Sequence, residues 1–142
     1  MSHKNPGSVL VDYYQGSEEP IIRISTESVE MLQLIGRVFE DLSKKRYSVF
    51  HFHEIEQARF VGLQSLTLQV IEGDREPRKA LECVKDAPPR SEFRWSKSSA
   101  GWDDSAWWIA GMLKLNQPGH QYLTNERGYD DALITISFRE GD

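Results

Sequence analysis

The stretch 107–138 constrains the fold of this chain more than any other part of the sequence. Its last segment, 132–139, alternates between apolar and polar residues, a pattern that predicts a β-strand with one buried face. Pro118 and Gly119 suit the two central positions of a type II turn and predict a chain reversal into residues 120–124. These features predict an antiparallel layer at the centre of the domain.

The apolar segment 107–115, which begins this stretch, is compatible with two secondary structures. Trp108, Met112 and Leu115 follow helical spacing, whereas other apolar residues lie on alternate positions. The turn that follows favours a strand, since it would reverse the chain into a neighbouring strand. We therefore expect a strand over residues 107–115.

An amphipathic segment at about residues 26–46 predicts one long helix. Ser25 or Thr26 can cap its first turn, and acidic residues that complement the helix dipole follow. Gly36 lies in the middle of this helix, where glycine costs about 1 kcal/mol relative to alanine. We expect Gly36 to allow close approach to a strand. The apolar positions that define the helix recur every three or four residues: Val29, Leu32, Ile35, Phe39 and Leu42.

Shorter segments complete the predicted fold. The β-prone segments 9–14 and 21–24 are joined by residues that include Gly16 and Pro20, which predicts an opening hairpin. Three further strands are predicted by apolar and aromatic residues in segments 47–54, 65–72 and 90–96.

A short second helix is predicted for 77–84, because Pro77 suits a first helical turn and Pro88-Pro89 would end the helix. Residues 1–8 form a predicted flexible tail, and residues 9–142 a single domain. The expected fold class is α+β, with a mainly antiparallel sheet of about five to seven strands packed against the long helix.

Composition narrows the classes of function. The 142 residues carry a net charge of −5, whereas a duplex-binding protein needs a basic face to displace counterions from phosphates. A basic protein is therefore a more natural partner for this acidic chain than nucleic acid. The chain has no apolar run long enough for a membrane span and no secretory signal, and its single cysteine, Cys83, cannot form an internal disulfide. We therefore expect a cytoplasmic protein that binds neither nucleic acid nor membrane.

Three histidines offer the clearest alternative, a small metal-dependent or acid/base enzyme. His51 and His53 would project from one face of a strand and could bind a divalent metal. His120 could supply a third ligand or act with Tyr122 as an acid/base pair. Hydrogen-bonded structural roles are the commoner explanation, and the sequence contains no recognised catalytic, metal or cofactor motif. We therefore expect a protein that is not an enzyme and uses no metal or cofactor.

Acidic residues near tryptophans suggest a protein-binding surface instead. The polar segment 96–104 predicts a mobile loop that carries Trp102, and aromatic residues surrounded by charges are typical anchors of protein interfaces. We expect Trp107 and Trp108 to pack in the core. The predicted partner-binding residues lie in this loop and in the loop before the last strand: Trp102, Asp103, Asp104, Glu126, Asp130 and Asp131.

The order of these elements resembles that of the small α+β immunity proteins of bacterial polymorphic toxin and contact-dependent inhibition systems. The likeness lies mainly in residues 119–138, where GHQYL, an acidic loop and DDALITISF follow one another. It implies a cytoplasmic inhibitor that binds a cognate toxin domain, commonly a basic nuclease. A third possibility is a homo-oligomeric adaptor domain with exposed aromatic residues at its own interface, so the chain is expected to be a monomer or a small homo-oligomer.

Overall fold

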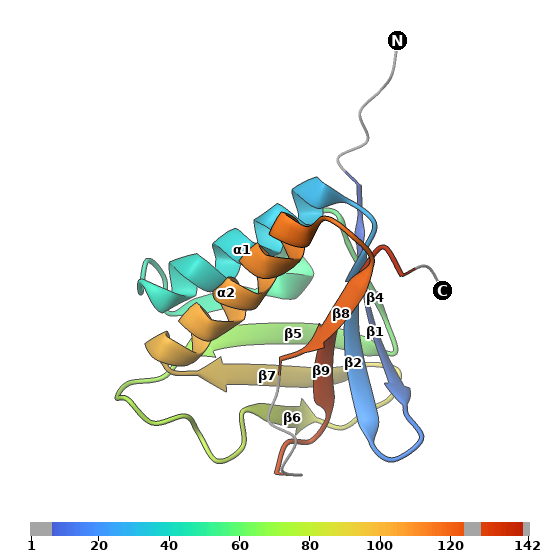
Figure 1. Ribbon diagram of the computed structural model, residues 1–142. Helices are drawn as coiled ribbons and strands as arrows, with labels where there is room; N and C mark the ends of the chain where they lie inside the picture. The colour runs from blue at the N-terminus through green and yellow to red at the C-terminus, as the bar shows by residue number, and fades with distance from the viewer. Residues whose placement is uncertain (1–6, 124–128, 141–142) are drawn as a thin grey trace.

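The computed structural model describes residues 7–123 and 129–140, which form two α-helices, nine β-strands and a short 3-10 helix. The predicted α+β class is confirmed. Figure 1 shows the two helices side by side along one side of the molecule, with the strands below and beside them. The strands are β1 (Val9–Gln15), β2 (Pro20–Thr26), β3 (Val49–His51), β4 (Ala58–Val61), β5 (Leu63–Val70), β6 (Leu81–Lys85), β7 (Ser91–Lys97), β8 (Gly119–Tyr122) and β9 (Leu133–Phe138).

The strands form two sheets, in the orders β4-β1-β2-β9-β8 and β3-β5-β7-β6. Both sheets are mixed, because the pairs β1–β4, β2–β9 and β5–β7 are parallel. The predicted opening hairpin and the alternating last strand are confirmed as β1–β2 and β9. The prediction of one mainly antiparallel sheet with five to seven strands is wrong. Alternation along a strand reveals its buried face, but not which distant strand lies next to it.

Helix α1 (Val29–Ser43) occupies the predicted amphipathic segment but begins later than expected. Ser28, rather than Ser25 or Thr26, caps it: its hydroxyl oxygen accepts a hydrogen bond from the Met31 amide at 3.2 Å. This bond satisfies one of the amides that a first helical turn leaves without an intrahelical partner.

Helix α2 (Ser99–Leu115) corrects two predictions, since it replaces both the mobile loop 96–104 and the strand 107–115. Ser98 caps this helix by accepting a hydrogen bond from the Gly101 amide at 3.1 Å. Asn116 ends it in a left-handed conformation with φ of 50°. With 17 residues α2 is longer than the 15-residue α1, so the prediction of one long helix is also wrong.

The two helices pack closely because Gly36 of α1 has no side chain. A Cβ atom at this position would lie 3.0 Å from Ile109 Cγ2 of α2. The expectation of a close approach at Gly36 was therefore correct, but the neighbour is a helix and not a strand.

Two shorter segments also differ from the sequence-based expectation. Segment 77–84 contains the start of β6, which pairs antiparallel with β7, so the predicted short helix is wrong. Segment 47–54 contains only the short strand β3, followed by the 3-10 helix η1 (Phe52–Glu54). In addition, residues 55–62, for which no strand was predicted, contain β4, which pairs with β1.

One apolar core joins the two sheets and the two helices. At its centre the Phe39 ring of α1 lies 5.6 Å from Trp95 of β7 and 5.4 Å from Trp102 of α2, measured between ring centroids. Aromatic pairs at these separations add to the free energy gained from burial. No helix in the described part of the chain is both long enough and apolar enough to cross a bilayer.

Candidate functional site

Trp102, predicted to lie on an exposed loop, is a core residue in the first turns of α2. Its side chain is 0% exposed, and its indole Nε1 donates a hydrogen bond to the Gln69 carbonyl oxygen of β5 at 2.9 Å. The Trp95 ring packs against it with a centroid separation of 4.9 Å. The loop prediction for Trp102 is therefore wrong, and its side chain is inaccessible to a partner in this conformation.

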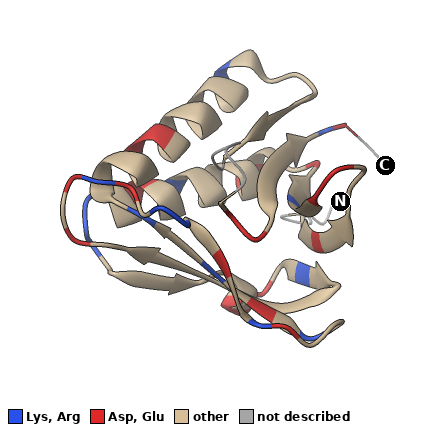
Figure 2. Cartoon of the chain, turned by 90° about the horizontal axis from the view of Figure 1, so that it is seen from below, with Lys and Arg blue, Asp and Glu red and all other residues tan. Residues whose placement is uncertain are grey.

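The predicted acidic residues fall into different environments. Asp103 and Asp104 are exposed on α2, not on a loop. Glu126 lies outside the described residues. The interval between Asp104 and Lys114 carries no charged side chain, and the ribbon of α2 is tan there in Figure 2.

Asp130 and Asp131 bind the backbone at the start of β6. Asp130 Oδ1 accepts hydrogen bonds from the amides of Ala80 at 2.6 Å and Leu81 at 3.0 Å. Asp131 Oδ2 accepts a hydrogen bond from the Cys83 amide at 2.7 Å. Strand β6 lies at the outer edge of the four-stranded sheet, so these carboxylates occupy backbone donors that would otherwise be open to another strand.

The environment of Asp131 favours its ionised form. Partial burial alone would raise the pKa of this carboxyl, but the Cys83 amide and the Lys79 ammonium outweigh that effect and lower the pKa. Lys79 Nζ lies 2.9 Å from Asp131 Oδ1. Asp130 and Asp131, two of the five acidic residues predicted to contact a partner, thus have a clear structural function.

The three histidines do not share a site. The rings of His51 and His53 are 5.3 Å apart, and His53 Nδ1 accepts a hydrogen bond from the Leu66 amide at 3.2 Å. His120 lies on β8 of the other sheet, where its Nδ1 is 2.7 Å from Glu140 Oε2. Among residues 7–123 and 129–140, no group of three or more His, Cys, Asp or Glu side chains could hold a metal ion.

Lys97, which is partly buried, lines a small cavity of about 90 Å³. Lys97 Nζ donates hydrogen bonds to Ser105 Oγ and to the Leu123 carbonyl oxygen, both at 2.9 Å. Burial lowers the pKa of this lysine. Glu76, which also lines the cavity, accepts hydrogen bonds from the amide and hydroxyl of Ser98 at the start of α2. These contacts anchor α2, and the cavity is too small for most organic substrates.

The outward side of α2 carries two exposed tryptophans, Trp107 and Trp108. We call this side of α2, together with the groove beside it, the aromatic face. Trp107 is 68% exposed and Trp108 is 42% exposed, and their rings meet edge to face at 5.1 Å. A groove of about 500 Å³ separates this part of α2 from β8. Its lining is mainly apolar and comprises Trp107, Trp108, Gly111, Met112, Lys114, Leu115, Gln117, Pro118, Gly119, His120 and Gln121.

Strand β8 extends the aromatic face onto the edge of the five-stranded sheet. Tyr122 is exposed at its end, and the His120–Glu140 pair lies beside the groove. Hydrogen bonds from Ser137 and His120 lower the pKa of Glu140, which favours its carboxylate form. The aromatic face therefore combines apolar side chains, an outer strand and a rim of charged groups.

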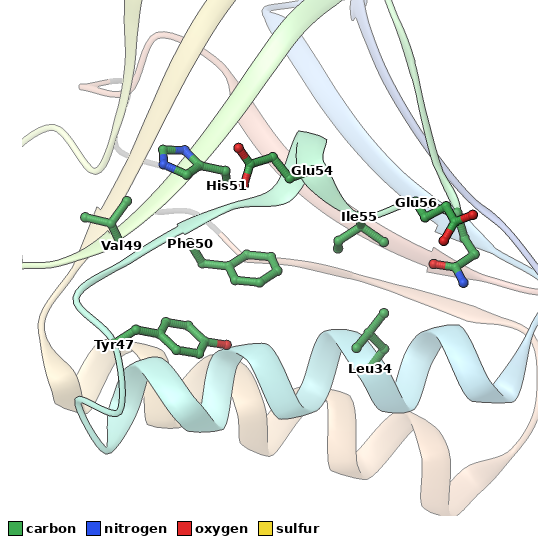
Figure 3. A pocket seen from close by; sticks show the side chains of 9 residues that line it. Leu34, Tyr47, Val49, Phe50, His51, Glu54, Ile55 and Glu56 are labelled. Carbon is green, nitrogen blue, oxygen red and sulfur yellow. The ribbon is translucent and has the colours of Figure 1, made fainter.

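A second cleft lies between α1 and the β3–η1 segment, with a volume of about 550 Å³ (Figure 3). Tyr47 and Phe50 stack within it at a centroid distance of 5.6 Å and an interplanar angle of 27°. We call it the α1–β3 cleft. It is lined by Leu34, Tyr47, Val49, Phe50, His51, Glu54, Ile55, Glu56 and Gln57.

The sequence-based prediction missed Trp107 and Trp108, which it assigned to the core. The available signal was the apolar composition of 105–113 on all sides of the helix, which one buried face cannot absorb. No family model, curated protein or solved structure significantly matches this chain.

Proposed function

We propose that this protein is a non-enzymatic, cytoplasmic immunity protein that binds a cognate bacterial toxin domain, such as a basic nuclease, and blocks its activity. The observation that carries the proposal is the exposure of Trp107 and Trp108 on one helix. Large aromatic side chains contribute disproportionately to protein interfaces, and leaving two of them in water is unfavourable for an isolated domain.

The groove beside these tryptophans supports the same function. Its apolar walls suit a protruding side chain of a partner, while Lys114 and His120 supply polar contacts at its border. The outer strand β8 offers backbone groups for pairing with an extended segment.

Charge supports the expected chemistry of the partner. The net charge of −5 favours encounter with a basic protein, and Asp103 and Asp104 lie on the same helix as the exposed tryptophans. Such complementarity raises association rates and selects among partners. We therefore retain Asp103 and Asp104 as proposed partner contacts.

The decisive experiment pairs this chain with the toxin domain encoded beside its gene. We expect the wild-type chain to block the toxin during co-expression and to bind it without turnover in calorimetry. The double variant Trp107→Ala/Trp108→Ala should weaken binding by about 30-fold or more, since a residue of this kind often contributes about 2 kcal/mol. Tyr14→Ala, at an exposed aromatic residue on β1, is the matched control and should bind normally.

Two results would contradict this proposal. A toxin that stays fully active with the wild-type chain would exclude the inhibitory function. Unchanged affinity in a folded Trp107→Ala/Trp108→Ala variant would exclude the aromatic face as the docking surface.

A second copy of this chain is the other candidate occupant, as in a homo-oligomeric adaptor. The observation in its favour is that β8 is an outer strand next to the exposed tryptophans, so two copies could pair edge to edge. Sedimentation of the wild-type chain should then show a dimer that the double tryptophan variant converts to a monomer. A wild-type monomer at all accessible concentrations would remove this candidate.

A further inference from the structure

The α1–β3 cleft has an apolar floor. Figure 3 shows Tyr47, Phe50 and Ile55 on the side of the β3–η1 backbone that faces α1, the helix that carries Leu34. The Tyr47 and Phe50 rings stack on each other with an interplanar angle of 27° and are only partly buried, so they leave aromatic surface open to the cleft. A planar ligand group could pack on this surface with little loss of conformational freedom.

The rim of this cleft is acidic. Glu54 and Glu56 line it and are exposed, and neither lysine nor arginine is among its lining residues in the described part of the chain. The ion pairs found among the described residues use other carboxylates. The negative charge of Glu54 and Glu56 is therefore left without a salt bridge in residues 7–123 and 129–140.

We infer that the α1–β3 cleft is a second binding site and takes an arginine side chain from a basic protein partner. A guanidinium group is planar, stacks on aromatic rings and pairs with carboxylates through a fork of donors. The partly exposed rings of Tyr47 and Phe50 match the first property, and the carboxylates of Glu54 and Glu56, which form no salt bridge among the described residues, match the second.

The identity of the partner rests on the proposed function, but the chemistry of the cleft does not. The cleft lies against α1 and β3, whereas the aromatic face is formed by α2 and β8. Two separate surfaces of this kind would contact different parts of one toxin domain, and linked contacts increase affinity more than either alone.

A short peptide can test the cleft without any toxin. The peptide acetyl-Gly-Arg-Gly-amide is titrated into the nitrogen-15-labelled full chain at low ionic strength, and amide chemical shifts are followed. We expect saturable shifts at Tyr47, Phe50, His51 and Glu54. The same peptide with citrulline in place of arginine keeps the shape but lacks the charge, and it should bind about tenfold more weakly or worse.

Two variants with the same change in net charge distinguish binding at the cleft from general electrostatic attraction to an acidic protein. Glu54→Gln/Glu56→Gln and Glu18→Gln/Glu19→Gln each change the net charge from −5 to −3, since each removes two acids. Glu18 and Glu19 lie in the β1–β2 connection, at the end of β2 remote from α1. The first variant should weaken arginine-peptide binding about two- to tenfold, and the second should leave it unchanged within about twofold.

Three results would overturn the inference: equal binding of the citrulline peptide, equal weakening by both charge variants, or shifts confined to residues outside the cleft. A thermal unfolding midpoint close to that of the wild type confirms that each variant is folded. A toxin that stays fully active with the wild-type chain would overturn the proposed function but leave these peptide results untouched, so failure of this inference is distinguishable from failure of the proposed function.

Discussion

At the scale of single residues, chemically similar side chains have opposite roles that their environments decide. Trp102 is buried and its indole is hydrogen-bonded, whereas Trp107, five residues later on the same helix, is 68% exposed. Asp103 is exposed on α2, whereas Asp131 accepts a hydrogen bond from the backbone of the outer strand β6. Residue type alone could not separate these cases, because the difference arises from which side of a helix or loop faces the core.

Replacing buried and exposed tryptophans should therefore give different results. Trp102→Ala should lower the free energy of unfolding by about 3–5 kcal/mol, because it leaves a cavity in the core. Trp107→Ala should change it by less than about 1 kcal/mol. Denaturant titration measures both, and a comparable loss in the two variants would contradict the assignment of Trp107 to a binding surface.

Asp131→Ala should lower the free energy of unfolding by about 1–3 kcal/mol, because the Cys83 amide and Lys79 lose a charged partner. Asp74→Ala, at an exposed loop acid, should stay within about 0.5 kcal/mol of the wild type. Denaturant titration at neutral pH is the measurement, and equal losses in the two variants would argue against the structural function of Asp131.

The effect of Asp131→Ala should also depend on pH in a defined direction. The pKa of Asp131 is lowered in the folded protein, so its contribution to stability is complete above the unfolded-state pKa of about 4. That contribution is lost as the pH falls through the lower, folded-state pKa. The stability difference between the wild type and Asp131→Ala should therefore shrink in acid, and a difference that grows below pH of about 4 would contradict the assigned ionisation.

At the scale of secondary structure, the contact between α1 and α2 depends on a glycine. Gly36→Val should lower the free energy of unfolding by about 1–3 kcal/mol, because the new side chain would collide with Ile109. Gly111→Ala is the control, since a Cβ there meets no atom within 4 Å, and it should raise stability by about 0.5–1 kcal/mol through helix propensity. Thermal and denaturant unfolding measure both changes. A change of stability in the same direction in the two variants would contradict this packing.

The sequence predicted elements correctly where one side of the element is buried. Helix α1 and strands β1 and β2 have a regular apolar pattern that matches their burial, whereas β9 alternates in sequence but is buried on both faces. Helix α2 was misassigned because its apolar residues surround the helix, with Ile109 in the core and Trp108 and Leu115 outside. Local patterns that conflict with the fold are expected at functional surfaces, which agrees with the proposal that the aromatic face binds a partner.

At the scale of the whole molecule, the sheet pairing could not be predicted because the partners are distant in sequence. Strand β9 pairs with β2 across more than a hundred residues, with Ile22 opposite Ile134. The same limit applies to the candidate site, since the groove and the α1–β3 cleft are each built from segments that only the fold brings together. Only the composition of α2 hinted at the aromatic face.

The single core predicts one cooperative unfolding transition. Near-ultraviolet circular dichroism reports the environment of Trp95 and Trp102, and far-ultraviolet circular dichroism reports backbone structure. Because residues of both sheets share the core, the two signals should change at the same denaturant concentration. Two separated transitions would show that the sheets unfold as independent units.

The central place of β9 has a consequence for the order in which the molecule assembles during synthesis. Strand β9 comes last among the described elements in chain order, yet it lies between β2 and β8 within its sheet. While a ribosome is still synthesising the chain, β2 has no neighbour on that side, and β8 has no partner strand. A nascent chain can thus assemble the β8 side of the aromatic face only after residue 138 has emerged, so unfinished molecules would lack the proposed docking surface.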